Sequence, residues 1–537
     1  MHGSLLRLGG LLAASCGMFA LFGPGALRAG DQPQWGQAWS RNMVSDEANL
    51  PGDFDPATGR NVLWTAEIGT QSYVSPIVSA GKVLVGTNND RPRLARHSGD
   101  RGVLLCLDCR DGKLMWQLTV PKAGDDPYLD WPRCGLTSPP TVEAGRAYVL
   151  TNRGDVVCLD QAGMANGNDG PYRDEGRFMA PKGVESVPVK PDDADILWTF
   201  SVPAQAGTYL HDGTFSSILI NGRHLYLNTC NGVDNTHRTI RRPDGPSLIV
   251  LDKQTGRIVA RDGEHIGPQI FHSTWAPPAM GEVNGRKLVF FGAGDGVCYA
   301  FEALGQDVGP ADGEPRALRK VWQFDCDPNA PKQDIHSYLG NRRESPSTIM
   351  AMPVFDAGRL FVAGGGDIWW GKTQCWLKCI DATKTGDVTR LAEVWSAPLN
   401  KHCCSTPAIR DGLVYIADCG RTLHCLDAGT GKEYWTHQTN GDIWASALVA
   451  DGKVYIGSRA GDFHILAAGR EKKLLCSVKL DSAISAPPTA ANGRLYLCTM
   501  KRLYVLGIKA SERAKAAPAW DATRLPRASS PRRRQAS

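Results

Sequence analysis

Residues 404–438 read CSTPAIRDGLVYIADCGRTLHCLDAGTGKEYWTHQ, and this stretch decides the fold. It begins with a Ser-Thr-Pro segment and continues with two runs in which apolar and polar residues alternate, separated by a glycine turn. It ends with a Leu-Asp pair, a Thr-Gly-Lys turn and Trp435. Alternation with a period of two predicts short β-strands, and the glycine turns predict hairpins between them. The stretch therefore predicts one small antiparallel sheet of about four strands.

Imperfect copies of this unit, eight in all, fill most of the chain. A four-stranded sheet at this repeat length is typical of a propeller blade, not of a solenoid coil. The eighth copy stops one strand short, whereas residues 61–68 (NVLWTAEI) form a strand with no inner strands before it. Donation of this strand to the eighth sheet would close the ring and remove an open sheet edge. The sequence therefore predicts an all-β, eight-bladed β-propeller of four-stranded antiparallel blades over residues 61–510.

Two residue types recur at fixed positions of the unit. Tryptophan falls at the same point of the outer strand in six copies, where its ring would cover the neighbouring blade and bury roughly 150–250 Å². Gly112 and Gly431 lie four residues before such a tryptophan and would supply the positive φ of a tight turn. The six tryptophans are Trp64, Trp116, Trp198, Trp322, Trp395 and Trp435.

The chain has 16 cysteines, which in an exported protein would ordinarily suggest disulfide bonds. Four of them, however, precede a Leu-Asp or Ile-Asp pair at the end of the same strand. A residue that recurs at one structural position is most simply a small buried packing residue. We therefore predict a packing role for Cys106, Cys158, Cys379 and Cys425.

The N-terminus is typical of a signal peptide. Arg7 gives a positive start, residues 8–22 an apolar core, and residues 26–29 a small-residue exit. Cys16 follows a stretch similar to a lipoprotein cleavage site, but the apolar run continues past it, which disfavours lipid attachment. The sequence predicts a signal peptide over 1–29 and a lead segment over 30–60. It also predicts an exported, monomeric protein of the periplasm or cell envelope with no transmembrane segment.

The net charge of +5 comes entirely from the C-terminus. Residues 511–537 hold seven Lys/Arg and two acids, so the remainder of the chain is neutral. A neutral body gives no electrostatic reason to expect nucleic-acid binding. The tail is rich in Pro, Ala, Ser and Arg without periodicity, and we predict that it is disordered.

The unit LDAGTGKEYW, repeated in a ring of eight blades of which six have the docking tryptophan, resembles the pyrroloquinoline-quinone (PQQ) type of repeat. The resemblance covers residues 61–510. Two groups of proteins share this repeat: the quinoprotein alcohol dehydrogenases, and non-catalytic propellers similar to the outer-membrane barrel-assembly lipoprotein. The resemblance implies the propeller fold but does not choose between an enzyme and a binding module.

Sites of propellers lie where inner strands begin, so unusual residues in the segments between units are the candidates for binding. Four histidines are in these segments, and side chains converging from several blades would form a polar, aromatic-lined pocket. No HExxH or paired CxxC spacing is present, so the sequence predicts no metal site. The pocket candidates are Tyr73, Asp130, Trp131, Arg133, His211, Asp212, His272, Trp275, Arg342, Glu344, His402 and Trp444.

Cys403 and Cys404 open the sixth unit and are adjacent, an arrangement that no other unit repeats. Quinoprotein alcohol dehydrogenases resemble this chain here, because they cover their cofactor with a vicinal disulfide. Their pair lies early in the chain, however, and their calcium ligands and catalytic Asp have no clear counterparts here. A CxxCH haem attachment is also missing.

Two hypotheses follow. The first is a binding or scaffold module whose channel mouth contacts a protein or an extracellular ligand. The second is a PQQ- and calcium-dependent alcohol or sugar oxidoreductase, in which Cys403 and Cys404 lie against the cofactor. A carboxylate such as Asp130, Asp212 or Glu344 would then serve as the base that takes the substrate hydroxyl proton.

Overall fold

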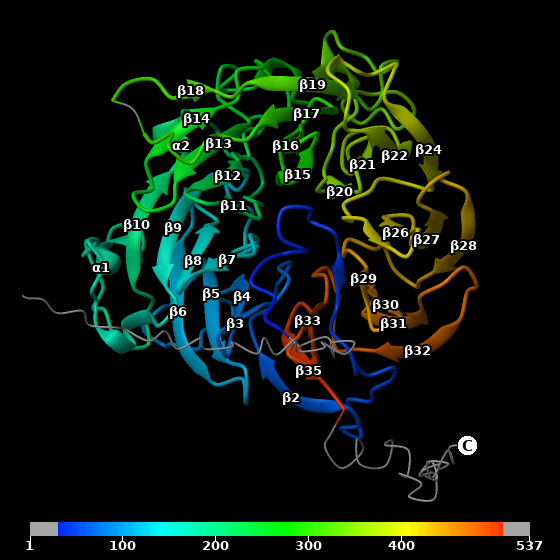
Figure 1. Ribbon diagram of the computed structural model, residues 1–537. Coiled ribbons are helices and arrows are strands. Elements are labelled where there is room, and N and C mark those ends of the chain that lie inside the picture. Colours follow the sequence, from blue (N-terminus) through cyan, green and yellow to red (C-terminus); the bar gives the residue numbers. More distant parts are fainter. Residues whose placement is uncertain (1–29, 311, 509–537) are drawn as a thin grey trace, which may run out of the picture.

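Eight sheets stand around a common axis in the computed structural model, which describes residues 30–310 and 312–508 (Figure 1). Each blade has four main strands that pair antiparallel, so the predicted eight-bladed propeller is confirmed. The predicted signal peptide with Cys16, and the basic tail, lie outside the described residues.

The first four blades use strands in chain order from the axis outward. Blade one consists of β3 (Ile77–Ser79), β4 (Lys82–Asn88), β5 (Arg101–Asp108) and β6 (Leu114–Pro121), and blade two of β7 (Thr141–Glu143), β8 (Arg146–Leu150), β9 (Asp155–Asp160) and β10 (Ile196–Ser201). Blade three consists of β11 (Leu219–Asn221), β12 (His224–Asn228), β13 (Leu248–Asp252) and β14 (Ile258–Arg261), and blade four of β15 (Ala279–Val283), β16 (Arg286–Gly292), β17 (Val297–Glu302) and β19 (Lys320–Asp325).

The last four blades repeat this order, except that the outermost strand of blade eight comes from the start of the chain. Blade five consists of β20 (Val354–Asp356), β21 (Arg359–Gly365), β22 (Cys375–Asp381) and β24 (Glu393–Leu399), and blade six of β25 (Ala408–Arg410), β26 (Leu413–Asp418), β27 (Thr422–Asp427) and β28 (Glu433–Gln438). Blade seven consists of β29 (Leu448–Ala450), β30 (Lys453–Gly457), β31 (Asp462–Ala467) and β32 (Leu474–Lys479), and blade eight of β33 (Thr489–Ala491), β34 (Arg494–Cys498), β35 (Arg502–Leu506) and β2 (Val62–Glu67).

Three two-residue strands extend blades seven, three and four, and short helical segments lie in the connections. None of the helices in the described part of the chain has the length and apolar character needed to cross a membrane. These elements are β1 (Val44–Ser45), β18 (Arg316–Ala317), β23 (Gly386–Asp387), α1 (Glu175–Phe178), α2 (Val202–Ala206) and the 3₁₀ segments η1 (Gly163–Asn166), η2 (Gly267–Gln269) and η3 (Ile335–Tyr338).

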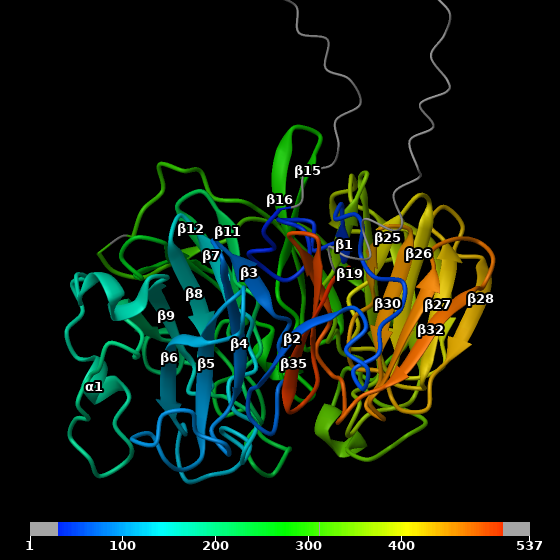
Figure 2. The same cartoon turned by 90° about the horizontal axis from the view of Figure 1, so that it is seen from below.

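The ring closes where the sequence predicts. Strand β2 pairs antiparallel with β35, with Trp64 opposite Val505, and the two strands lie side by side in both views (Figures 1 and 2). The first described strand of the repeat thus completes the last blade. The edge of β35 is paired instead of exposed.

The tryptophan column joins six of the eight blades to the following blade by a repeated contact. In every case the indole Nε1–H donates to a backbone carbonyl in the turn before the outer strand of the following blade. The ring also lies against that turn: a Cβ added at Gly256 would come 2.4 Å from Cε3 of Trp198. The hydrogen bonds are Trp64 to Cys109 (3.1 Å), Trp116 to Gln161 (3.0 Å), Trp198 to Lys253 (3.2 Å), Trp322 to Ala382 (3.2 Å), Trp395 to Ala428 (3.1 Å) and Trp435 to Gly469 (2.9 Å).

The turn glycines therefore have two functions. Gly256 and Gly431 have φ of 69° and 73°, which favour glycine. They also leave room for the indole of the preceding blade, with a Cβ at Gly431 only 2.6 Å from Trp395. The predicted packing cysteines Cys106, Cys158, Cys379 and Cys425 are all fully buried between the sheets.

Residues 30–45, which we call the hub segment, occupy the centre of the ring (Figure 1). The sequence assigns no structure to them, since they have no strand periodicity. The hub segment forms hydrogen bonds with the innermost strand of each of blades one to seven and with the innermost hairpin turn of blade eight. The pairs, given first for blade eight and then for blades one to seven in order, are Gly30–Asn492, Gln32–Val78, Pro33–Val142, Trp39–Ile220, Trp39–Met280, Ser40–Phe355, Asn42–Ile409 and Met43–Val449.

Arg41 lies at the middle of the hub segment and is fully buried. Its guanidinium donates to the carbonyl oxygens of Ser217 (2.8 Å), Pro278 (3.1 Å) and Trp35 (3.4 Å). Burial lowers the pKa of Arg41 to about 9, so the side chain still carries its charge at neutral pH. One cation thereby links the hub segment to blades three and four.

We expect Arg41→Ala to lower the free energy of unfolding by about 3 kcal/mol, because buried carbonyl oxygens lose charge-assisted hydrogen bonds. Urea denaturation followed by tryptophan fluorescence measures this change. Arg60→Ala is the matched control, since the Arg60 side chain is 53% exposed and pairs only with Asp53. Equal stability of the two variants would contradict a structural role for the hub segment.

We expect Gly256→Ala to destabilise the ring more than Gly412→Ala. Both glycines have positive φ, 69° and 74°, so alanine costs about 1–2 kcal/mol at either position. At Gly412 no atom lies within 4 Å of the added Cβ, whereas at Gly256 the indole of Trp198 blocks it. Overpacking adds about 1–3 kcal/mol. Denaturation curves for the two variants that coincide would refute the docking role of this turn.

Candidate functional site

One face of the ring carries all the connections that line its axial cavity. Antiparallel strands alternate in direction, so the connections between blades and those between second and third strands emerge on the same face. The cavity there has a volume of about 470 Å³, within the range of about 300–1,000 Å³ for small-molecule sites. Trp35 of the hub segment also lines it. The hub segment and the connections thus together enclose the cavity.

The wall of the cavity is mainly aromatic. Trp275 and Trp369 meet edge to face with ring centroids 5.4 Å apart, and Trp369 meets Trp444 in the same way at 6.1 Å. Tyr73 stacks on Trp444 at 6.4 Å. Among the described residues that line the cavity, Asp212 has the only carboxylate, and none is Lys or Arg. The wall therefore suits flat, uncharged ligands.

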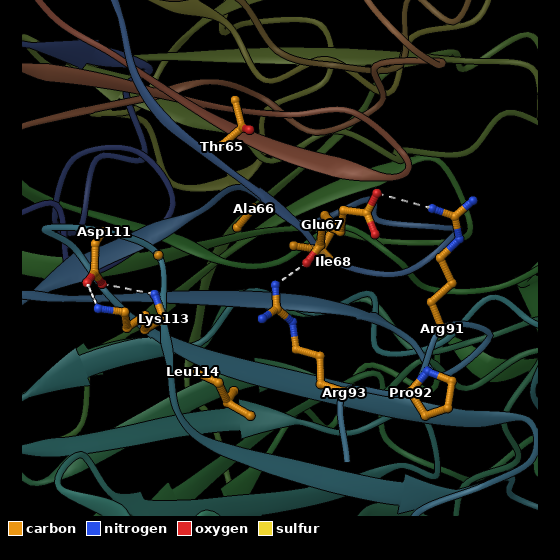
Figure 3. A pocket seen from close by; sticks show the side chains of 11 residues that line it. Thr65, Ala66, Glu67, Ile68, Arg91, Pro92, Arg93, Asp111, Lys113 and Leu114 are labelled. Carbon is orange, nitrogen blue, oxygen red and sulfur yellow. Dashed lines mark hydrogen bonds and ion pairs between the residues drawn. The ribbon is translucent and has the colours of Figure 1, made fainter. Parts of the chain in front are cut away.

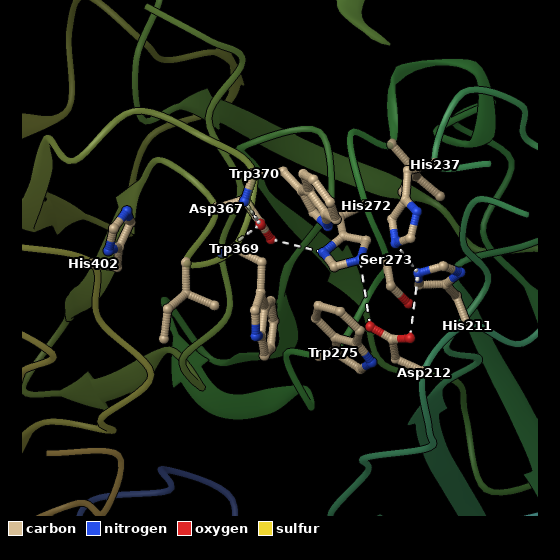
Figure 4. A network of polar contacts seen from close by, with 12 residues as sticks. His211, Asp212, His237, His272, Ser273, Trp275, Asp367, Trp369, Trp370 and His402 are labelled. Carbon is tan, nitrogen blue, oxygen red and sulfur yellow. Dashed lines mark hydrogen bonds and ion pairs between the residues drawn. The ribbon is translucent and has the colours of Figure 1, made fainter. Parts of the chain in front are cut away.

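Three histidines and one aspartate gather at one side of the cavity (Figure 4). Their ligand-type atoms all lie within 4.8 Å of one another, so these residues could hold a metal ion. His211 Nε2 is 3.2 Å from His237 Nε2 and 3.7 Å from Asp212 Oδ1, and His272 Nε2 is 3.6 Å from Asp212 Oδ2. We call His211, Asp212, His237 and His272 the histidine cluster.

The histidine cluster comes from three connections of blades three and four. His211 and Asp212 precede β11, His237 lies between β12 and β13, and His272 precedes β15. Asp212 has φ of 60°, an uncommon conformation for a residue with a side chain. Its N–H donates to Tyr128 O at 2.6 Å, and its carbonyl accepts from Trp131 at 3.0 Å. Contacts to the preceding connection therefore hold the carboxylate in this position.

Asp367, between β21 and β22, orients His272 from behind. Its Oδ2 is 3.0 Å from His272 Nδ1, and its Oδ1 accepts from the N–H groups of Trp369 (2.9 Å) and Trp370 (2.8 Å). Burial alone would raise the pKa of Asp367, but His272 and these two N–H groups outweigh burial, and the pKa lies below its usual value. Asp367 is thus an ionised carboxylate that accepts the Nδ1 proton of His272.

Burial sets the protonation of the cluster. Burial, followed by the neighbouring His272 and His237, lowers the pKa of His211 to about 3. Burial and then His272 lower the pKa of His237. Burial raises the pKa of Asp212 to about 6. At neutral pH His211 and His237 are therefore uncharged, and the carboxyl of Asp212 is mostly ionised.

Several residues predicted from the sequence meet at this cavity. Tyr73, Trp131, Asp212, Trp275 and Trp444 line it, and His211 and His272 stand beside it in the histidine cluster. Arg342 donates to Trp369 O at 3.0 Å and lies 3.3 Å from His402 Nε2. Arg342 and His402 therefore support the connection that carries Trp369, but they do not line the cavity.

Three predicted candidates do not reach the cavity. Asp130 is buried and lies 2.5 Å from Lys122 Nζ, with a further hydrogen bond from Asn152 at 2.7 Å. Arg133 is 71% exposed at its side chain and faces Asp90 at 3.9 Å. Glu344 is exposed on the surface. Of the three carboxylates predicted as a possible catalytic base, Asp212 is therefore the one that lines this cavity.

The adjacent cysteines have different surroundings. Cys403 is buried, and its thiol donates to Ala417 O at 3.2 Å and to Ser405 O at 3.4 Å. Burial raises the pKa of the Cys403 thiol well above its usual value. Cys404 instead lines the cavity, and both are free thiols in this structure.

The sequence reading did not select several residues of the site. His237, Asp367, Trp369 and Trp370 lie between the second and third strands of blades three and five, and Tyr128 lies between blades one and two. The sequence prediction was confined to short segments just before inner strands. The available signal was length, because the connections around His237 and the Trp-Trp pair are longer than most of their counterparts and emerge on the same face.

A second hollow of about 770 Å³ lies on the outer side of the ring between β2 and β6 (Figure 3). Its charged residues are exposed and pair with one another: Arg91 lies 3.7 Å from Glu67, and Lys113 lies 2.7 Å from Asp111. Arg93 donates to the backbone oxygen of Glu67. This hollow is larger than the axial cavity but has no convergent chemistry, so the axial cavity is the candidate site.

Solved structures with the same fold include two dehydrogenases. A europium-containing methanol dehydrogenase is 12% identical and covers 89% of this chain and 98% of its own, with a TM-score of 0.54. A quinohemoprotein alcohol dehydrogenase from Pseudomonas putida is 12% identical and covers 89% and 81%, with a TM-score of 0.53. BamB from Moraxella catarrhalis is 14% identical and covers 82% and 98%, with a TM-score of 0.46. At these identities the likeness to the two dehydrogenases shows the fold alone.

The family comparison is more specific. No curated protein matches the chain. The family model described as outer membrane protein assembly factor BamB matches residues 47–165, 314–443 and 378–469, which is more than half of the 537 residues. The chain therefore belongs to the PQQ-like repeat family of β-propellers that this model describes.

Proposed function

We propose that this protein is a binding propeller whose axial cavity takes an uncharged, ring-shaped organic molecule, with saccharides as the preferred class. The observation that carries the proposal is the cavity of about 470 Å³ walled by tryptophan and tyrosine. Flat aromatic faces bury large apolar areas, and the indole N–H adds a hydrogen-bond donor. A saccharide presents both an apolar ring face and polar hydroxyl groups, so it matches such a wall.

A protein partner is the second candidate, favoured by two large aromatics at the mouth. Trp131 is 46% exposed and Trp369 is 44% exposed, and exposed aromatic surface often marks a contact site. The family description, an assembly factor of the outer membrane, supports the same reading and a location in the cell envelope. The concave shape favours the small ligand over a flat protein interface.

The alternative of a PQQ- and calcium-dependent oxidoreductase fits these residues poorly. Calcium takes oxygen ligands, whereas the histidine cluster offers three imidazoles and one carboxylate. PQQ is a polycarboxylate, and no Lys or Arg is among the described residues that line the cavity. Cys403 is turned toward backbone oxygens, so only Cys404 faces the site.

We expect Trp369→Ala to weaken saccharide binding by roughly 10-fold or more, since truncation of a central tryptophan removes a dominant contact. Calorimetric titration of the purified protein with a panel of disaccharides measures the affinity. Trp376→Ala is the matched control, because Trp376 lies on β22 beside Lys372 and Lys378, outside the cavity.

Two results would overturn the proposal. One is the lack of saturable binding for every saccharide of the panel, or equal weakening by Trp376→Ala. The other is saturable binding of PQQ in the presence of calcium together with dye-linked alcohol oxidation, which would establish the oxidoreductase instead.

A further inference from the structure

We propose that His211, His237, His272 and Asp212 bind one divalent transition-metal ion of the zinc type in the wall of the axial cavity. The inference concerns the side chains of the histidine cluster and is independent of which organic molecule the cavity takes. A metal site was not predicted from the sequence, because the four residues come from three separate connections and have no recognisable spacing.

The donor atoms are already close to a coordination geometry. In a tetrahedral zinc site with bonds of about 2.0–2.1 Å, ligand atoms lie about 3.3 Å apart. In the cluster, His211 lies 3.2 Å from His237 and 3.7 Å from Asp212, and His272 lies 3.6 Å from Asp212. All four donor atoms lie within 4.8 Å of one another, so side-chain movements of about 1–1.5 Å would bring them to this spacing.

Unpartnered buried atoms support the binding of a cation. Within the described residues, His272 Nε2 and Asp212 Oδ1 have no hydrogen-bond partner, although the side chain of His272 is only 1% exposed. Buried polar atoms are nearly always satisfied, and each exception calls for an explanation such as a bound ion. Both atoms are aimed into the same small volume, and one metal ion would satisfy both.

The support around the cluster is the kind that metal-binding histidines require. Because Asp367 accepts the Nδ1 proton of His272 at 3.0 Å, the lone pair of Nε2 is directed toward Asp212. A carboxylate in this position fixes the tautomer and the ring orientation of a ligand histidine. Trp369 and Trp370 donate to the other oxygen of Asp367, so the same carboxylate joins the aromatic wall to the cluster.

The donor set selects the class of ion. Imidazole nitrogen with one carboxylate suits zinc and its neighbours in the first transition row, while calcium and magnesium require mostly oxygen ligands. The calcium ion that the quinoprotein resemblance implies does not match this set. Asp212 and His237 also line the cavity, so a bound ion would face any ligand held there.

Metal binding is tested on the full chain purified without a histidine tag and treated with a chelator. Calorimetric titration with ZnCl₂ is expected to give one equivalent per chain that excess CaCl₂ does not displace. Co²⁺ is expected to give the visible absorption of a four-coordinate nitrogen and oxygen site. A thiolate charge-transfer band in the near ultraviolet would instead place the ion on cysteines and overturn the proposal.

Three variants locate the ion. His272→Ala is expected to abolish the one-equivalent binding, and Asp367→Asn to weaken it by about 10–100-fold. His265→Ala is the matched control, since His265 is 65% exposed at its side chain and lies outside the cluster. Circular dichroism and thermal unfolding confirm that each variant is folded. Should His272→Ala not fold, Asp367→Asn and the Co²⁺ spectrum of the unchanged protein decide the matter.

Zinc binding that is weak, or that is equal in Asp367→Asn and His265→Ala, would refute the metal site. The two proposals fail separately. Saccharide binding without zinc binding would support the proposed ligand cavity and refute the metal site. Zinc binding without saccharide binding would support the metal site and refute the proposed ligand class.

Discussion

The hub segment is the constraint on which the rest of this propeller depends. Eight blades around one axis leave a central space too wide for their own innermost side chains to fill. Residues 30–45 enter that space and bond in turn to every blade. The strands β3, β7 and β11 lie at the inner ends of their sheets, so without the hub segment their inner edges would expose unpaired backbone groups.

Closure of the ring uses a second, outer set of contacts. The indole of one blade lies on the turn of the next and donates to its carbonyl oxygen, as Trp198 does at Lys253. The hub segment fixes the inner radius, and the tryptophan column fixes the spacing at the outer rim. Held at both radii, the blades present their connections on one face in fixed positions. A cavity made only of connections can therefore keep a defined shape.

Sequence reasoning predicts the parts that repeat and finds only some of the parts that do not. The strands, the closure by β2 and the tryptophan column each leave a periodic signal, because every blade needs the same residue type at the same place. The hub segment has no sequence periodicity, and its role at the centre of the ring becomes visible only in the three-dimensional structure. The sequence likewise does not link His237 to Asp367, since they belong to different blades and each contacts His272 through three-dimensional packing alone.

The same division explains how one fold can carry different sites. In this chain two unpartnered buried atoms, His272 Nε2 and Asp212 Oδ1, lie in connections that the scaffold does not need for closure. Asp212 also holds a backbone conformation that non-glycine residues seldom adopt, and such strain persists only where the surrounding structure over-determines it. The hub segment, the tryptophan column and the eight sheets supply the surrounding contacts that hold this strained conformation. The two dehydrogenases share this fold at 12% identity, so the propeller alone does not determine what a site at its axis can do, and the side chains of the connections do.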